Sequence, residues 1–184
     1  MTSAHEQRRV VATGLVVQVV AAALVVVLQP QLAVATLHAS VWSVLEGAAA
    51  GAVLYAVLRR ALAPAATVAN PARSLAFRGL AVTVVAWAEE TLWRGVLLGV
   101  LAARSAVFAL VLSTAGFAAA HVYGQGWTAL RTHALTGVTF GALYVVTGSL
   151  AAAIVAHAVY NLFVVADDGA RRKRRAAALK GATS

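Results

Sequence analysis

The sequence predicts an all-α protein, a polytopic bundle of transmembrane helices with about six spans. The 184 residues are 61% hydrophobic with a mean hydropathy of +0.83. Only 11% are charged, whereas soluble domains carry roughly 25%. The apolar runs have about the 20 residues that a spanning helix needs, and they lack the alternating polarity of a membrane β-barrel. Because backbone groups in lipid must bond within their own segment, such runs form helices.

The chain is expected to form one integral membrane domain over residues 1–184. The candidate functional core covers about residues 79–166, and residues 167–184 form a basic cytoplasmic tail. Pro30, Pro64 and Pro71 fall in the breaks between apolar runs, as expected when the runs are unbroken helices. The expected spans are 10–28, 37–58, 79–101, 105–122, 133–147 and 149–166.

The positive charges predict orientation and location. The net charge is +9, and the block Arg171–Arg175 directly follows the last apolar run. Beside a hydrophobic segment such a block indicates the cytoplasmic face and anionic lipid headgroups rather than nucleic acid. An even number of spans with both termini cytoplasmic fits the other Arg positions, and the composition favours a bacterial plasma membrane. The first run, followed by "AVA" at 33–35, could instead be a cleaved signal sequence.

Two adjacent carboxylates lie deep in the third span. Glu89 and Glu90 are two of only six acidic residues, and counting from Gly79 places Glu89 about 15 Å deep, near the midplane. Glu90 and Arg94 are i,i+4 neighbours that can pair, which could be a purely structural ion pair. Glu89 points about 100° away, without a partner on its own helix, which suits it to act as a general base.

Two further helices carry polar pairs at helical spacing. Phe117 and His121 share one face of the fourth span, and His157 and Asn161 share one face of the last. Each could be a structural feature, an interfacial His or an interhelical hydrogen bond. Together with Glu89 they could activate a water molecule and donate hydrogen bonds to an oxyanion. His133, close to Arg131 at the start of a span, is expected to face lipid headgroups.

The motifs "EETLWR" (89–94), "FAAAH" (117–121) and "GVTFGALYVVTGSLAAAIVAHAVYN" (137–161) resemble the CPBP family of intramembrane proteases. This family comprises CAAX proteases, including type II CAAX prenyl endopeptidases, and bacteriocin-processing enzymes, and is also called ABI. The resemblance covers about residues 79–163. Each motif is short, but all three occur in order and at membrane depth.

The resemblance implies an intramembrane endopeptidase, a hydrolase that cuts a membrane-associated protein or peptide. Glu89 would activate water with help from His121, while His157 and Asn161 would stabilise the oxyanion. Glu90 and Arg94 would orient the site and engage the substrate. Glu89, His121 and His157 could hold a divalent metal such as zinc, or act equally without a metal.

Other functions remain open on sequence grounds. They are a non-proteolytic scaffold or bacteriocin self-immunity protein of the same fold, and a small proton-coupled transporter. The expected partners are the lipid bilayer and the substrate, with no nucleic acid. Substrate identity and oligomeric state are not encoded in the motifs.

Overall fold

The structure, a computed structural model, describes residues 4–28, 39–62 and 75–181, and this part of the chain is helical with no strand. The all-α class is thereby confirmed for these residues. The elements are α1 (Ala4–Leu28), α3 (Val41–Ala61), α4 (Leu75–Glu90), the π-helix η1 (Thr91–Leu98), α5 (Gly99–Ala102), α6 (Ala106–Gln125), the 3₁₀ turn η2 (Trp127–Ala129), α7 (Leu130–Thr147) and α8 (Leu150–Gly181).

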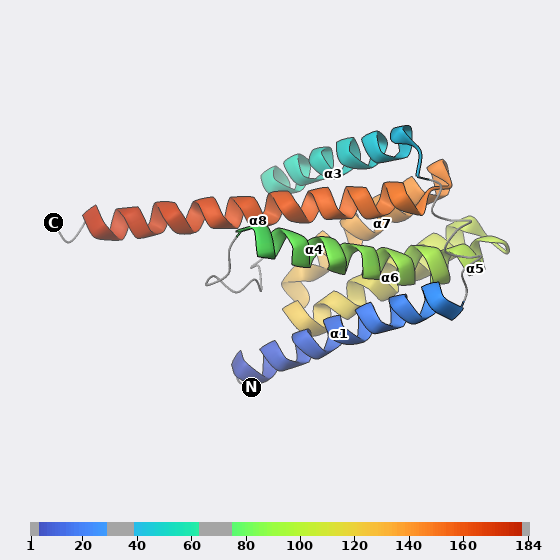
Figure 1. Cartoon of the computed structure of the whole chain (residues 1–184), viewed down its shortest axis with the longest axis horizontal. Coiled ribbons are helices and arrows are strands. Elements are labelled where there is room, and N and C mark those ends of the chain that lie inside the picture. Colours follow the sequence, from blue (N-terminus) through green and yellow to red (C-terminus); the bar gives the residue numbers. More distant parts are fainter. Residues whose placement is uncertain (1–3, 29–38, 63–74, 182–184) are drawn as a thin grey trace.

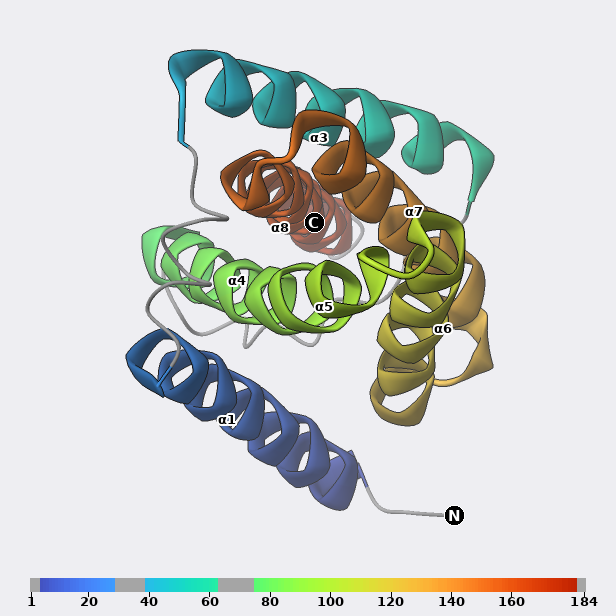
Figure 2. The same cartoon turned by 90° about the vertical axis from the view of Figure 1, so that its right-hand side faces the viewer.

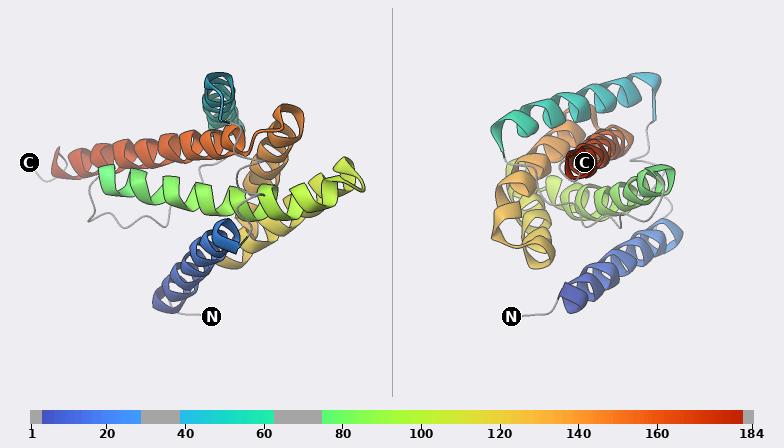
Figure 3. Two further views of the ribbon diagram at one scale, coloured as in Figure 1. Left: turned by 45° about the vertical axis from the view of Figure 1, so that its right-hand side comes forward. Right: turned by 90° about the vertical axis from the view of Figure 1, so that its left-hand side faces the viewer.

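Helix α8 lies at the centre of the bundle. It packs between α3 and α4, and α7 lies beside it and against α6 (Figures 1 and 2). Helix α4 runs on through η1 into α5, which packs on α6, while α1 lies on the outside against α4 (Figure 3). The last helix extends well beyond its expected end at residue 166, so that the basic segment continues α8 (Figure 1).

The bundle buries several charged side chains among apolar ones and exposes many large apolar side chains. Arg94, Glu89 and Glu90 are buried, whereas large apolar side chains on several helices are exposed, such as Val57 and Val111. Exposed apolar surface of this extent marks contact with a membrane or a partner. Two helices, Val41–Ala61 and Leu150–Leu179, are long and apolar enough to cross a membrane. The count of six spans stays a prediction.

Small residues bring α3 directly onto α8. A Cβ atom on Gly47 or Gly51 would collide with the backbone carbonyl oxygen of Ala152 or Ala156 on α8. Glycines four residues apart allow such close helix contact in membranes. Because Ala156 precedes His157, the same contact fixes the position of α8 beside the polar interior.

A tight turn reverses the chain between α7 and α8. Gly148 has φ +64°, and its N–H bonds to the Tyr144 carbonyl at 2.8 Å. A left-handed glycine closing a helix in this way is a common C-cap. The Thr147 hydroxyl accepts from the Ser149 N–H at 3.2 Å. The "TGS" segment thus places α7 antiparallel to α8, with the Phe140 ring stacked on the His157 ring.

The third predicted span differs from an ordinary α-helix. It begins at Leu75, before the expected residue 79, and widens into η1 directly after Glu90. The Gly99 N–H bonds to the Arg94 carbonyl five residues back, the π-helical pattern. Ser113 on α6 donates to the Trp93 carbonyl at 2.7 Å. Such π segments occur frequently at functional sites.

Candidate active site

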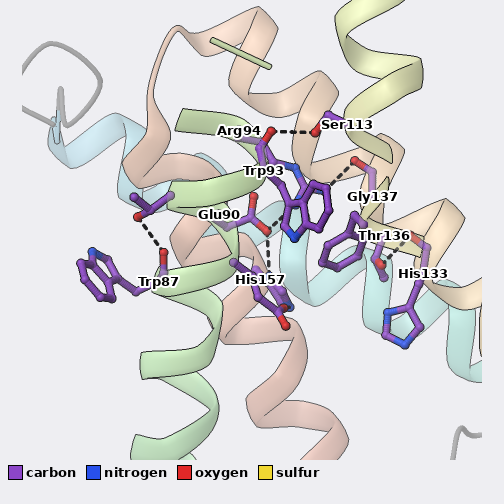
Figure 4. A network of polar contacts seen from close by, with 12 residues as sticks. Trp87, Glu90, Trp93, Arg94, Ser113, His133, Thr136, Gly137 and His157 are labelled. Atoms are coloured by element: carbon purple, nitrogen blue, oxygen red, sulfur yellow. Dashed lines mark hydrogen bonds and ion pairs between the residues drawn. The ribbon is translucent and has the colours of Figure 1, made fainter. Parts of the chain in front are cut away.

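A fully buried ion pair forms the centre of the polar interior. Arg94 Nη1 donates to Glu90 Oε1 at 3.0 Å, and neither side chain has any exposed surface. Arg94 Nη2 donates to the Gly137 carbonyl on α7 at 2.9 Å (Figure 4). The i,i+4 pairing expected from the sequence is present, and Arg94 also links η1 to α7.

Two aromatic rings lie close to the Arg94 guanidinium. Its guanidinium carbon lies 4.6 Å from the ring centroid of Phe117 and 5.9 Å from that of Phe140. Both rings are completely buried. A cation over an aromatic face is stabilised by the ring quadrupole, and more so where water is excluded. Arg94 is therefore committed to Glu90, Gly137 and the rings, which favours an orienting role over direct contact with a substrate.

The same carboxylate fixes His157. The His157 Nδ1 lies 2.7 Å from Glu90 Oε1 (Figure 4). A carboxylate paired with Arg94 accepts hydrogen bonds, so Nδ1 carries the proton and donates. The opposite nitrogen, Nε2, lies 3.7 Å from Glu89 Oε2. Glu90 thus orients His157 so that its second nitrogen faces the other carboxylate.

His121 approaches Glu89 from the other side. Its Nδ1 donates to the Phe117 carbonyl at 2.9 Å, because a carbonyl can only accept. Its Nε2 lies 3.6 Å from Glu89 Oε1. Glu89 is buried between the two imidazoles, and both approaches are longer than a hydrogen bond. The structure brings together Glu89, His121 and His157, three side chains from three helices.

Asn161 occupies the next turn of α8. It is partly exposed and makes no hydrogen bond to the described residues. Of the six residues expected at the site, five are linked by ion pairs or close approaches among the described residues, and Asn161 is not linked to them in this way. The five are Glu89, Glu90, Arg94, His121 and His157.

The prediction that His133 faces lipid headgroups is wrong. The ring lies against the site, stacked on His121 with centroids 3.7 Å apart and planes at 23°. Its Nε2 is 3.3 Å from Gln125 Oε1. Helix α7 begins at Leu130, so that His133 lies within its first turn and faces inward rather than towards headgroups. Its spacing to Gly137 (i+4) and Phe140 (i+7) places all three on one helix face, and this signal could have revealed it.

Phe117 is the common contact of the site. Its ring centroid lies 4.5 Å from that of His121, 5.7 Å from His133 and 5.9 Å from His157. Sequence reasoning placed Phe117 on the face of His121 but gave it no role. It did not anticipate Phe140, which stacks on His157 at 4.8 Å, or the Gly137 carbonyl, because backbone acceptors leave no mark in residue types.

Glu89, His121 and His157 are the side chains expected to hold a metal. The fixed tautomers turn the Nε2 atoms of His121 and His157 towards Glu89. However, no three His, Asp or Glu side chains of the described residues come together in an arrangement that could hold a metal ion.

Comparison with known protein families assigns the chain to one of them. Residues 71–163, half of the 184, match the family model "Type II CAAX prenyl endopeptidase Rce1-like". The chain belongs to this family. The Rce1-like region contains every expected site residue, from Glu89 to Asn161, whereas α1 and α3 lie outside it. No curated protein and no solved structure matches the chain.

Membership confirms the resemblance seen in the motifs. Rce1-like proteins are membrane-embedded CAAX-type proteases, and two helices apolar enough to span a bilayer fit that setting. The chain is accordingly a protease-type hydrolase by family.

Proposed function

We propose that the protein is an intramembrane endopeptidase in which Glu89 activates a water molecule to attack a peptide bond of a membrane-associated substrate. The observation that carries this proposal is the buried Glu89 carboxylate facing two imidazole nitrogens of fixed orientation at 3.6 and 3.7 Å. Gaps of this length suit a group held between the three side chains and bonded to each. Proton transfer by a positioned carboxylate typically contributes 10²–10⁴-fold to a rate.

In the proposed reaction Glu89 takes a proton from water, and the water oxygen adds to the scissile carbonyl carbon. His121 accepts a hydrogen bond from the same water at Nε2, since its Nδ1 is bound to Phe117. The tetrahedral intermediate then collapses, and the proton held by Glu89 passes to the leaving amine. Hydrolysis is complete without any other reactant.

The oxyanion is stabilised from α8. The Asn161 amide donates one hydrogen bond, and protonated His157 donates another from Nε2. His157 is the imidazole that faces both carboxylates.

Glu90 and Arg94 act as positioning residues in this scheme. Glu90 holds His157 through Nδ1, and Arg94 holds Glu90 and the α7 backbone. Their complete burial argues against the expected contact with substrate. Because the described donors do not form a three-ligand group, every step is assigned to the chain's own residues.

The proposed location is the bacterial plasma membrane, with both termini cytoplasmic. The start of α1 and the end of α8 lie on the same side of the bundle (Figure 1). Near that end Asp167 and Asp168 pair with Arg59 of α3 and Arg78 of α4, and the basic run continues along α8. Positive charge concentrates on the cytoplasmic side of membrane proteins. The bilayer and a membrane-associated substrate are the proposed partners.

The proposal is tested with purified protein in liposomes and a fluorogenic prenylated CAAX peptide, beside the same peptide without the prenyl group. The wild type should release the fluorophore, and Glu89→Gln should lose at least about 10²-fold in kcat while keeping its fold. Asp167→Asn, far from the site, is the control variant. Unchanged cleavage in both Glu89→Gln and His121→Ala would remove the protease assignment.

The alternatives give different results in the same preparation. A scaffold or immunity protein binds the peptide without cleaving it. A proton-coupled transporter acidifies the liposome lumen in a Glu89-dependent manner without releasing the fluorophore. Cleavage of the prenylated peptide alone would assign the substrate class.

A further inference from the structure

We infer that His133 is a positioning residue of the active site, which holds the His121 ring in its working orientation by stacking on it. This inference rests on the proposed function, since it assigns a part in the same hydrolysis. It goes beyond the proposed function because His133 lies outside the three motifs and was expected to face lipid headgroups.

The His121 ring has few other restraints. The terminal torsion of a His side chain is broad rather than confined to sharp rotamers. The ring has one hydrogen bond, from Nδ1 to the Phe117 carbonyl on its own helix, and its Nε2 is 3.6 Å from Glu89. Its side chain is 13% exposed, more than that of His157. A ring held by a single bond at the edge of the site needs a surface that blocks its rotation.

His133 supplies that surface. The near-parallel stack, 3.7 Å between centroids and 23° between planes, covers one face of His121. The Phe117 ring lies 4.5 Å from the same imidazole and tilted by 51°. Rotation of His121 about its terminal torsion would drive the ring into one of these two neighbours, so the Nε2 atom stays directed at Glu89.

The stacking ring is itself anchored. His121 and Gln125 are one turn apart on α6, and His133 reaches both of them from α7. An amide oxygen can only accept, so His133 Nε2 carries the proton and donates to Gln125. The Phe117 ring contacts His133 edge-on at 5.7 Å. His133 therefore fastens the end of α6 to the start of α7 at the point where His121 enters the site.

The stacking role of His133 can be distinguished from proton transfer by replacing its imidazole with an aromatic ring that has no nitrogen. His133→Phe keeps an aromatic surface but has no nitrogen, whereas His133→Ala removes the surface. Arg131→Ala, an exposed position two residues earlier, is the matched control. The assay is cleavage of the prenylated CAAX peptide by the full chain in liposomes, with kcat and KM determined separately.

We expect His133→Ala to lower kcat by about 10- to 100-fold with KM nearly unchanged, since small displacements of a catalytic group cost this much. His133→Phe should retain kcat within about threefold of the wild type, and Gln125→Ala should lose an intermediate amount. Equal loss in the Phe and Ala variants would overturn the stacking role in favour of nitrogen chemistry. Wild-type kcat in His133→Ala would overturn it entirely.

A second measurement does not depend on cleavage. In protein labelled with ¹⁵N-histidine, the His121 signals should report a protonated Nδ1 and an unprotonated Nε2, assigned with His121→Gln. His133→Ala should mix the two tautomers, and His133→Phe should not. If the wild type cleaves nothing but the tautomer responds as expected, the proposed function fails and the positioning role stands. If cleavage depends on Glu89 and the tautomer is unaffected in His133→Ala, the positioning role fails alone.

Discussion

Replacement of Arg94 by methionine tests whether the centre of the bundle is held by charge. The change leaves the Glu90 carboxylate buried without its cation and removes the donor to the Gly137 carbonyl. At 3.0 Å and an effective dielectric of about 20, the lost attraction is on the order of 5 kcal/mol. Breaking one side of a buried pair typically costs about 3–5 kcal/mol. We expect Arg94→Met to lower the free energy of unfolding by this amount.

The double variant Arg94→Met with Glu90→Leu is the matched comparison. Replacing a whole buried pair by apolar side chains is often neutral or stabilising, so the double variant should recover most of the lost stability. It should nevertheless remain inactive, because His157 Nδ1 loses its acceptor. Stability is measured by unfolding in mixed micelles titrated with SDS, and activity with the prenylated peptide.

Three results would contradict these expectations. If Arg94→Met unfolds at the same SDS fraction as the wild type, the buried carboxylate is not compensated by Arg94. If the double variant is no more stable than Arg94→Met, the loss arises from packing around the guanidinium rather than from an uncompensated charge. Recovery of stability together with activity would contradict the role of Glu90 in orienting His157.

Further predictions concern the surrounding packing and the metal question. Phe117→Leu should destabilise the protein by about 1–3 kcal/mol and lower kcat at least tenfold, since three imidazoles and a guanidinium contact that ring; equal kcat would show the ring to be only packing. Gly51→Ala should cost about 1–3 kcal/mol by overpacking against α8, whereas Gly14→Ala, with open space, should cost nothing measurable by SDS titration. Asp168→Asn removes the carboxylate that pairs with the buried Arg78 and should lower stability by about 1–3 kcal/mol in the SDS titration; an unchanged unfolding midpoint would show that Arg78 does not depend on this partner. Cleavage should survive dialysis against 1,10-phenanthroline, because the described donors form no three-ligand group; loss of activity restored by zinc would reverse this assignment.

The sequence predicted those parts of the site that depend on the spacing of residues along a single helix. The Glu90–Arg94 pair, the separation of Glu89 from it and the His157–Asn161 pair all follow from i,i+4 geometry. That Glu89, His121 and His157 meet was expected only from the order of the motifs. Their distances depend on the packing of α4, α6 and α8, which no local pattern contains.

The π-helix and the histidine stack were beyond sequence reasoning for a different reason. Widening after Glu90 depends on support from another helix, such as the Ser113 hydroxyl at the Trp93 carbonyl. His133 was misplaced because its depth was judged from the neighbouring Arg131, although it shares a face with Gly137 and Phe140. Proximity to a charge along the chain says little about which way a side chain points in the folded bundle.

The sequence by itself determined that this is an all-α protein suited to a membrane, with a charged motif on its third long helix, because hydropathy and helical periodicity are local properties. It also predicted which side chains are candidates for hydrolysis. Only the tertiary structure decided which of them touch: Glu90 orients His157, Arg94 is sealed between Phe117 and Phe140, and His133 joins the site. The physical reason is that tautomers, ring stacking and charge compensation depend on contacts between helices far apart in the chain.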